Sequence, residues 1–272
     1  MNKRKIIGIA LIIAIFIGLG LTILYIFNEL DNEHDIEIQQ VQTTDGKKFK
    51  NEYEVLNNQE VSEGKVYREV SIPDDNPIKY ATASDIVNRI DNKETFIVYF
   101  GFDTCPWCRS IVETLINTAK ENDISTIYYV DVKNIRDVYT LNDNNEAVRT
   151  TEGTEGYYAL LDRLDNILAK YSPLSYDEVK KVRGKKTTVK TLVNIDEKRI
   201  YAPNVVLVKD GVGKILTTGI PDELTDPYME LTESMLAYTK EEFKKLFNES
   251  KTTTTTTTSH GSGEVCEGPS NC

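Results

Sequence analysis

One stretch of the sequence constrains the fold more than any other: an apolar run that leads directly into two closely spaced cysteines. Residues 96–100 are β-branched or aromatic, and Lys93-Glu94 and Gly101 bound them. A short run of this kind predicts a strand that is buried on both faces. From Cys105 to about Lys120 the apolar residues keep i, i+4 spacing, which predicts an amphipathic helix. The chain therefore passes from a buried strand through a Cys-x-x-Cys turn into a helix.

This arrangement places Cys105 and Cys108 at the N-terminus of the predicted helix. The unpaired N–H groups and the partial positive charge of a helix N-terminus favour a thiolate over a thiol. We therefore expect Cys105 to have a lowered pKa and to act as the nucleophile, with Cys108 as the resolving thiol. Pro106 suits the first helical turn, where its missing N–H costs nothing, and Arg109 would add a cation beside the pair.

Two other interpretations of this cysteine pair are half of a zinc site and an inert structural disulfide. A structural zinc site needs two further Cys or His ligands. The only other candidates are His34, His260, Cys266 and Cys272, which all lie in polar segments predicted to be tethers. The strand-to-helix context favours redox chemistry over both alternatives, and neither a metal nor an organic cofactor is expected.

The N-terminus predicts a membrane anchor. Residues 1–5 contain three basic side chains, and the run at 6–27 carries no charge. A helix of that length spans roughly 33 Å, enough for a hydrocarbon core of about 30 Å. A cleaved signal peptide is the alternative, but no small-x-small cleavage site follows the run. The positive flank predicts a cytoplasmic N-terminus in the cell membrane, with the body of the protein outside, where disulfides are permitted.

The remaining chain divides by composition into three parts. Residues 28–65 are polar and are interpreted as a tether with one short helix near residues 49–56. Residues 66–247 form the predicted domain, interrupted by an insertion at 133–199. Residues 248–272 are a Thr-rich flexible tail that carries the second cysteine pair. A net charge of −11 argues against a nucleic-acid partner, which would require a basic face.

The hydrophobic pattern predicts further elements within the domain. Strands are expected at 66–72 and 125–132, a short helix is expected to open at Thr82, and an amphipathic helix at 154–171 lies within the insertion. Residues 205–208 and 214–217, joined by Asp210-Gly211, predict a hairpin, and the last helix is expected at 228–247. The basic run at 180–190 is interpreted as a solvated connector.

Two motifs give the chain a resemblance to the thioredoxin superfamily over roughly residues 80–247. The first runs from Thr104 to Arg109 as Thr-Cys-Pro-Trp-Cys-Arg, and the second is Tyr201-Ala-Pro-Asn204 before the 205–208 strand. With the single membrane anchor, the chain is most similar to thioredoxin-like proteins of Gram-positive bacteria, including those described as bacteriocin transport accessory proteins.

The resemblance implies an α/β fold in which helices flank a central mixed sheet, with a helical insertion before the strand that follows Pro203. It also implies that Pro203 is a cis-proline facing the thiols, that the Ala202 backbone hydrogen-bonds an extended substrate, and that Trp107 and Pro203 shape the docking surface. The implied activity is thiol–disulfide exchange with exported proteins or with a membrane electron-transfer partner, in a direction that the motif leaves open.

The sequence departs from the thioredoxin pattern at several positions. Tyr99 stands where thioredoxins place an Asp, so the buried proton acceptor is missing or replaced. Asp103 is interpreted as a solvated loop acid or as an accessory group in proton transfer. The Pro106-Trp107 pair resembles glutaredoxins and disulfide oxidases more than reducing thioredoxins. The insertion lies where oxidase-like relatives carry a helical cap, and extra packing explains it equally well.

The tail cysteines allow a further hypothesis. A flexible chain between residue 247 and Cys266 reaches about 25 Å, so Cys266 and Cys272 could exchange electrons with Cys105. The alternative is a local disulfide or an incidental tail. For the whole protein, two other functions remain open: a non-enzymatic binding or assembly module that uses the same groove, and a glutaredoxin-like enzyme that uses glutathione.

Overall fold

The computed structural model describes residues 44–252 of the 272-residue chain. The predicted anchor at 6–27, most of the predicted tether, and the tail with Cys266 and Cys272 lie outside these residues. Within the described range, no helix combines the length and the apolar character that a membrane span requires.

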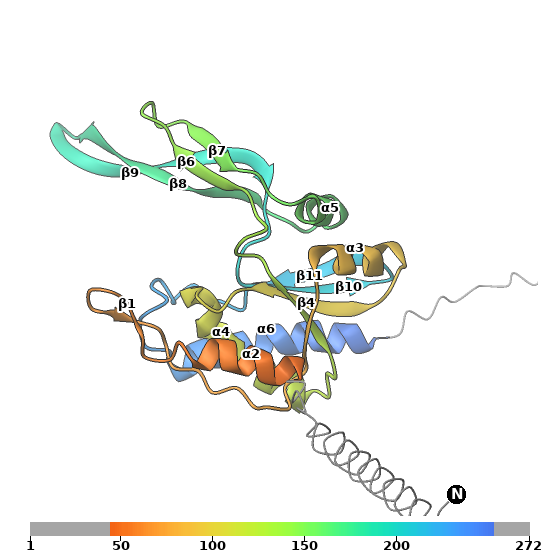
Figure 1. The fold of residues 1–272 in the computed structure, drawn as a ribbon. Coiled ribbons are helices and arrows are strands. Elements are labelled where there is room, and N and C mark those ends of the chain that lie inside the picture. The colour runs from red at the N-terminus through yellow and green to blue at the C-terminus, as the bar shows by residue number, and fades with distance from the viewer. Residues whose placement is uncertain (1–43, 253–272) are drawn as a thin grey trace, which may run out of the picture. The chain divides into compact units, whose positions relative to one another are not determined.

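A five-stranded mixed sheet forms the centre of the fold, in the strand order β3-β5-β4-β10-β11 (Figure 1). The strands are β3 (Ile78–Tyr80), β5 (Ile127–Asp131), β4 (Phe96–Gly101), β10 (Asn204–Lys209) and β11 (Val212–Thr217). The first three run parallel, whereas β10 is antiparallel to both β4 and β11. The predicted α/β class with a mixed sheet flanked by helices is therefore confirmed.

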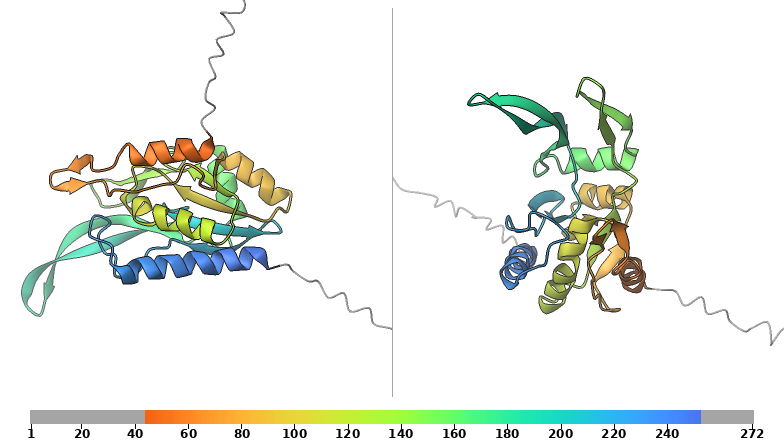
Figure 2. Two further views of the ribbon diagram at one scale, coloured as in Figure 1. Left: turned by 90° about the horizontal axis from the view of Figure 1, so that it is seen from below. Right: turned by 90° about the vertical axis from the view of Figure 1, so that its left-hand side faces the viewer.

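Helices cover both faces of this sheet (Figure 2). One face carries α2 (Asp45–Glu54), α4 (Pro106–Glu121) and α6 (Glu233–Lys251); the other carries α3 (Ala83–Asp91) and α5 (Glu155–Arg163). The strand period of two sorts the β4 side chains between the faces. Ile97 and Tyr99 pack in the α2–α4–α6 layer, whereas Val98 and Phe100 pack in the α3–α5 layer. Because β4 is buried along its whole length, the predicted central strand is confirmed.

Local signals in the sequence account for the ends of several elements. Thr82 caps α3, and Asp85 and Thr82 each accept a hydrogen bond from the other's backbone N–H, which forms a capping box. In the β10–β11 hairpin, Asp210 and Gly211 both adopt positive φ angles, as a two-residue turn requires. The predicted hairpin and the predicted short helix are thus confirmed.

The strand predicted at residues 66–72 is wrong in most of its length. Only Lys65–Val66 form a strand, β2, which pairs with the short β1 (Glu60–Ser62). Tyr67 still bonds to the backbone of Asn58 and Gln59, but beyond it the chain is extended and side chains rather than a neighbouring strand hold its backbone. The Asn57 amide donates to the Val70 carbonyl at 2.9 Å and accepts from the Val70 N–H at 3.0 Å.

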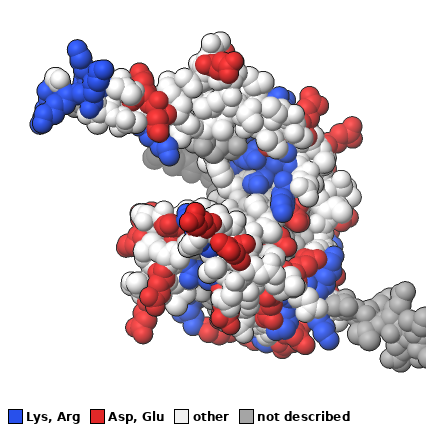
Figure 3. Space-filling view, turned by 60° about the vertical axis from the view of Figure 1, so that its left-hand side comes forward, with Lys and Arg blue, Asp and Glu red and all other residues white. Residues whose placement is uncertain are grey.

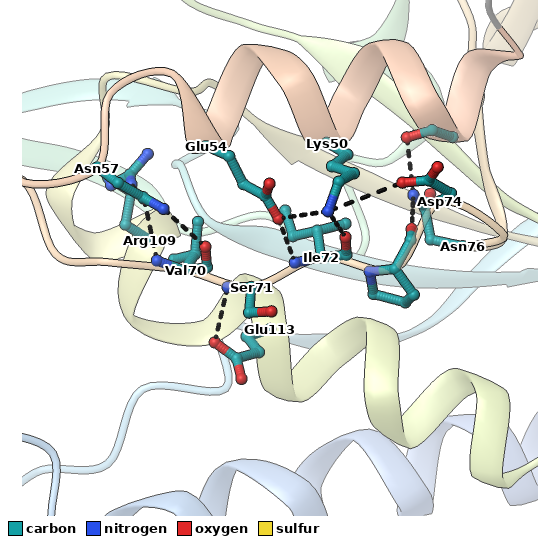
Figure 4. Close-up of polar contacts among 12 residues, drawn as sticks. Lys50, Glu54, Asn57, Val70, Ser71, Ile72, Asp74, Asn76, Arg109 and Glu113 are labelled. Carbon is teal, nitrogen blue, oxygen red and sulfur yellow. Dashed lines mark hydrogen bonds and ion pairs between the residues drawn. The ribbon is translucent and has the colours of Figure 1, made fainter.

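The same replacement of strand pairing by side chains continues along this segment (Figure 4). The Ile72 N–H donates to the Glu54 carboxylate at 2.7 Å, and the Ile72 carbonyl accepts from Lys50 Nζ at 2.6 Å. Ser71 N–H donates to Glu113 of α4 at 3.1 Å. The extended segment is therefore held between α2 and α4 by side chains of both helices.

The predicted tether at 28–65 needs correction, because the folded unit already begins at Asp45. Helix α2 buries Phe49 and Tyr53 completely in the core beneath β4 and β5. Only two aromatic residues in this polar helix provide the burial, so the composition of the segment did not predict that the helix belongs to the folded unit. The helix lies slightly earlier than the expected one near residues 49–56.

The insertion at 133–199 is mainly β structure, so the expectation of a helical insertion is wrong. It contains two antiparallel hairpins, β6 (Val138–Leu141) with β7 (Ala147–Thr151) and β8 (Lys170–Val182) with β9 (Lys185–Lys198). Its one helix, α5, ends at Arg163 rather than near residue 171. The basic run at 180–190 forms the end of the β8–β9 hairpin, where Lys and Arg side chains gather (Figure 3).

Candidate functional site

The cysteine pair stands where the sequence predicted, at the end of a buried strand and the start of a helix. Cys105 is the N-cap residue of α4, and Pro106 occupies the first helical turn. The Cys105 Sγ accepts a hydrogen bond from the backbone N–H of Cys108 at 3.3 Å. The sulfur thus takes the position that a Ser or Asp side chain commonly holds at a helix N-terminus, where N–H groups favour a negative charge.

The Ala202–Pro203 segment faces Cys105. Strand pairing explains this approach, because Asn204 at the start of β10 pairs with Phe100 near the end of β4. The Ala202–Pro203 peptide bond is cis, as the resemblance implied. The Cys105 thiol donates to the Ala202 carbonyl over 3.4 Å. The structure therefore brings Cys105, Ala202 and Pro203 together from two distant parts of the chain.

Both thiols are free and buried, but their surroundings shift their pKa values in opposite directions. The pKa of Cys105 is lowered, first by a hydrogen bond from the Cys108 side chain and then by the backbone N–H groups at the helix start, while burial opposes the shift. The pKa of Cys108 is raised well above its usual value, first by burial and then by its contact with Cys105. Cys105 is therefore the thiol poised to ionise.

Arg109 has a different role from the one expected. Its side chain is 1% exposed, and its guanidinium donates to the carbonyls of Tyr53 at 2.8 Å and of Arg68 at 2.6 Å. It also donates to the Asn57 side chain at 2.6 Å. Arg109 thus ties α2 and the extended segment to the start of α4, and a longer contact of 3.5 Å joins it to the Asp103 carbonyl in the turn before Cys105.

The cation that acts on Cys105 is Arg136, which sequence reasoning missed. Its charge contributes to lowering the pKa of Cys105. The guanidinium lies 5.4 Å from the centroid of the Phe102 ring and donates to the Ile200 carbonyl at 3.4 Å. Its Nε is buried without a hydrogen-bond partner among the described residues. Arg136 belongs to the insertion, so only the fold brings it to the thiol, and no local pattern marks it.

An open groove of about 430 Å³ lies beside the thiols. Trp107, Ala202 and Pro203, all predicted site residues, line it together with residues that the sequence did not single out. The additional lining residues are Tyr201, Thr218, Ile220, Pro221, Asp222 and Leu224. Most of these come from the loop after β11, and their mixed apolar and polar composition suits an extended peptide.

The remaining predicted site residues lie on either side of the thiols. Asp103 Oδ1 accepts from the Thr104 N–H at 2.6 Å, so it stabilises the turn before Cys105. Tyr99 is fully buried in the layer beneath the thiols, and its hydroxyl lies 3.0 Å from the Tyr53 hydroxyl. The proposed tail pair, Cys266 and Cys272, lies outside the described residues.

Neither a metal cluster nor a known relative points to another chemistry for this site. Within residues 44–252, no group of three or more His, Cys, Asp or Glu side chains gathers in a way that could hold a metal ion. No model of a known protein family matches the chain, and no curated protein matches it. Functional interpretation therefore rests on the geometry of the thiol site itself.

Proposed function

We propose that this protein is a thiol–disulfide oxidoreductase of the thioredoxin type. One observation carries the proposal: the Cys105 Sγ caps helix α4, 3.3 Å from the Cys108 N–H and 3.4 Å from the Ala202 carbonyl. The helix N-terminus favours the Cys105 thiolate, and the second thiol stands one turn away. The mixed sheet flanked by helices and the cis-proline opposite the pair support the likeness to thioredoxins.

The proposed reaction has two exchange steps. The Cys105 thiolate attacks one sulfur of a client disulfide, which breaks the client S–S bond and releases one client thiolate. Cys108 then loses its proton and attacks the Cys105 sulfur, and the second client thiolate leaves. The client gains two electrons and two protons, and the enzyme ends as the Cys105–Cys108 disulfide. Run in reverse, the same steps oxidise a client dithiol.

The groove lined by Trp107 and Pro203 would hold the client segment that carries the attacked sulfur. The clients would be exported proteins or a membrane electron-transfer partner if residues 6–27 anchor the chain as expected. The groove also supports a second candidate, a binding module that holds peptides without exchanging disulfides, because its lining alone would suffice for binding.

A redox titration of the full-length chain in mild detergent tests the proposal. Cys266 and Cys272 would be replaced by Ser so that only the active pair titrates, and the fluorescence of Trp107, the single Trp, would report the transition. We expect a reversible two-electron transition that Cys105→Ser abolishes. A potential near −270 mV would mark a reductant and one near −120 mV a disulfide donor. Absence of a transition would favour the binding module.

A further inference from the structure

Tyr99 occupies an unusual position in the layer that supports the thiols. It lies on β4, opposite Tyr129 of β5 in the sheet register. A Cβ at Gly101, two residues further along the same face, would lie 2.4 Å from the Tyr99 hydroxyl and from its ring carbon Cζ. The missing side chain at Gly101 therefore lets the Tyr99 ring lean along the strand toward the end where the cysteines stand.

Tyr53 of α2 holds the Tyr99 hydroxyl from the other side. The two hydroxyl oxygens are 3.0 Å apart, and both side chains are 0% exposed. The position of Tyr53 is itself fixed, because its carbonyl accepts from Arg109 at 2.8 Å and its ring packs at a tilt against Phe49 with centroids 4.5 Å apart. The pair of hydroxyls is thus a rigid polar group in an otherwise aromatic layer.

The Tyr99 hydroxyl and the Cys108 thiol belong to the same fully buried cluster, and the hydroxyl acts to lower the pKa of Cys108 against the larger effect of burial. The other titratable groups around Cys108 are Cys105 on its own helix, Tyr53, Tyr129 of β5 and Arg136. Among the described residues, no carboxylate hydrogen-bonds to Cys108 or to either tyrosine hydroxyl. Besides the Cys105 thiol, the polar group beside the resolving thiol is therefore a phenol.

We propose that Tyr99, held by Tyr53, is the positioning residue of the resolving thiol and stabilises Cys108 in the reduced form of the enzyme. The inference rests on the proposed function and deepens it. A phenol hydroxyl can accept a hydrogen bond from a thiol and can donate one to a thiolate, whereas a disulfide sulfur is a weak acceptor. The contact therefore favours the dithiol over the disulfide and makes the pair more oxidising.

The same geometry specifies how the proton of Cys108 is handled. Burial raises the pKa values of Tyr99 and Tyr53 well above the usual range, so both hydroxyls stay protonated. Tyr99 can therefore orient Cys108 but cannot take its proton. When Cys108 attacks the Cys105 sulfur, the S–S bond to the client breaks, and the proton of Cys108 passes to the departing client thiolate.

Three isosteric variants of the full-length chain test the inference, each in the Cys266→Ser/Cys272→Ser background and followed by Trp107 fluorescence. Tyr99→Phe removes the proposed hydrogen bond, and Tyr53→Phe removes its support. Tyr129→Phe is the matched control, because Tyr129 is 1% exposed and its ring lies 5.5 Å from that of Tyr99, yet no hydrogen bond joins it to either thiol.

We expect Tyr99→Phe to shift the dithiol–disulfide equilibrium about tenfold toward the disulfide, which makes the potential about 30 mV more negative. Tyr53→Phe should shift it in the same direction by less, and Tyr129→Phe should leave it unchanged. The pH at half-maximal rate of mixed-disulfide release should rise in Tyr99→Phe, since the lost hydrogen bond favoured the Cys108 thiolate.

An unchanged potential in Tyr99→Phe would overturn the inference, as would an equal shift in Tyr129→Phe, which would point to packing rather than to the hydroxyl. Either result leaves the proposed function intact, provided that the parent chain with all three tyrosines shows a reversible redox transition. Absence of a transition in that parent chain would instead remove the proposed function.

Discussion

Cys105 and Cys108 stand one helical turn apart, but they belong to two different regions of the molecule. Cys105, which is 4% exposed, lies at the N-terminal end of α4 among backbone N–H groups, the Ala202 carbonyl and the charge of Arg136. Cys108 is completely buried and packs beside the aromatic side chains of α2, β4 and β5. The first region lowers a thiol pKa, and the second raises one.

The contrast shows how one residue type can take two roles within four residues. A thiol that attacks a client must ionise and be reachable, whereas a thiol that resolves must wait for an intramolecular partner. Desolvation and hydrogen bonding supply that difference. The predictions below change one region at a time.

Removing either thiol should have the largest effect. Cys105→Ser should abolish the exchange of protein disulfides, because no nucleophile remains at the helix N-terminus. Cys108→Ser should also stop turnover but should still allow one attack per chain. Client thiols released on a single exposure to a client disulfide, without added reductant, would be measured. The Cys108→Ser chain should release one client thiol per chain and the Cys105→Ser chain none. Equal release by the two variants would mean that the regions do not divide the work.

The pH dependence of alkylation should separate the two thiols by more than about tenfold, since one unit of pKa changes the thiolate fraction tenfold below the pKa. A lowered pKa means that the thiolate forms at lower pH, so Cys105 should react below the pH at which a free cysteine does. Cys108, with its raised pKa, should stay unmodified until much higher pH. Peptide mass spectrometry after brief alkylation measures both; similar profiles would contradict the account.

Asn57→Ala should loosen the side-chain network that holds α2. It should therefore affect the Cys108 region but leave the Cys105 region unchanged. The amide serves both the N–H and the carbonyl of Val70, so its loss leaves backbone groups partly unpaired and should cost about 2 kcal/mol of unfolding free energy. The control is Asn51→Ala, at an exposed position of α2, which should change the free energy of unfolding by less than about 0.5 kcal/mol.

Denaturant unfolding measures this difference. Alkylation of Cys108 should become faster in Asn57→Ala, whereas the reactivity of Cys105 should be unaffected. A loss of stability no larger than that of Asn51→Ala would show that the extended segment is held by other contacts.

Arg136→Gln should have the smallest effect and should act chiefly on the Cys105 region. Loss of the charge should raise the pKa of Cys105 and slow its alkylation at neutral pH by roughly twofold to fivefold, since a partly solvated charge contributes modestly. Arg183→Gln removes the same charge from the exposed end of the β8–β9 hairpin and serves as the control. Equal slowing in both variants would indicate a long-range effect of net charge.

Local patterns in the sequence were sufficient for the sheet centre and for the thiol turn. The β4 run, the Cys-x-x-Cys spacing and the Asp210-Gly211 turn each predict their structure from a few neighbouring residues. The same reasoning failed at residues 66–72, where the composition suits a strand but side chains of α2, of α4 and of Asn57 just after α2 take the backbone hydrogen bonds.

The predictions that failed depend on contacts between distant segments. Arg109 was expected to act on the thiols, but it binds the carbonyl of Tyr53, in a region taken for a tether, and that of Arg68, in a segment taken for a strand. The charge of Arg136, in the insertion, acts on the pKa of Cys105, and Tyr53 of α2 contacts Tyr99. In each case the sequence shows an ordinary polar or aromatic residue, and only the packing of a separate element gives it a role.

The most direct test of the division between the two thiols is to identify which sulfur captures a client. The full-length Cys108→Ser and Cys105→Ser chains would each be incubated with a peptide disulfide and then mapped by mass spectrometry. The account predicts a stable mixed disulfide on Cys105 in the first chain and none on Cys108 in the second. Capture by Cys108 at a comparable rate would contradict it.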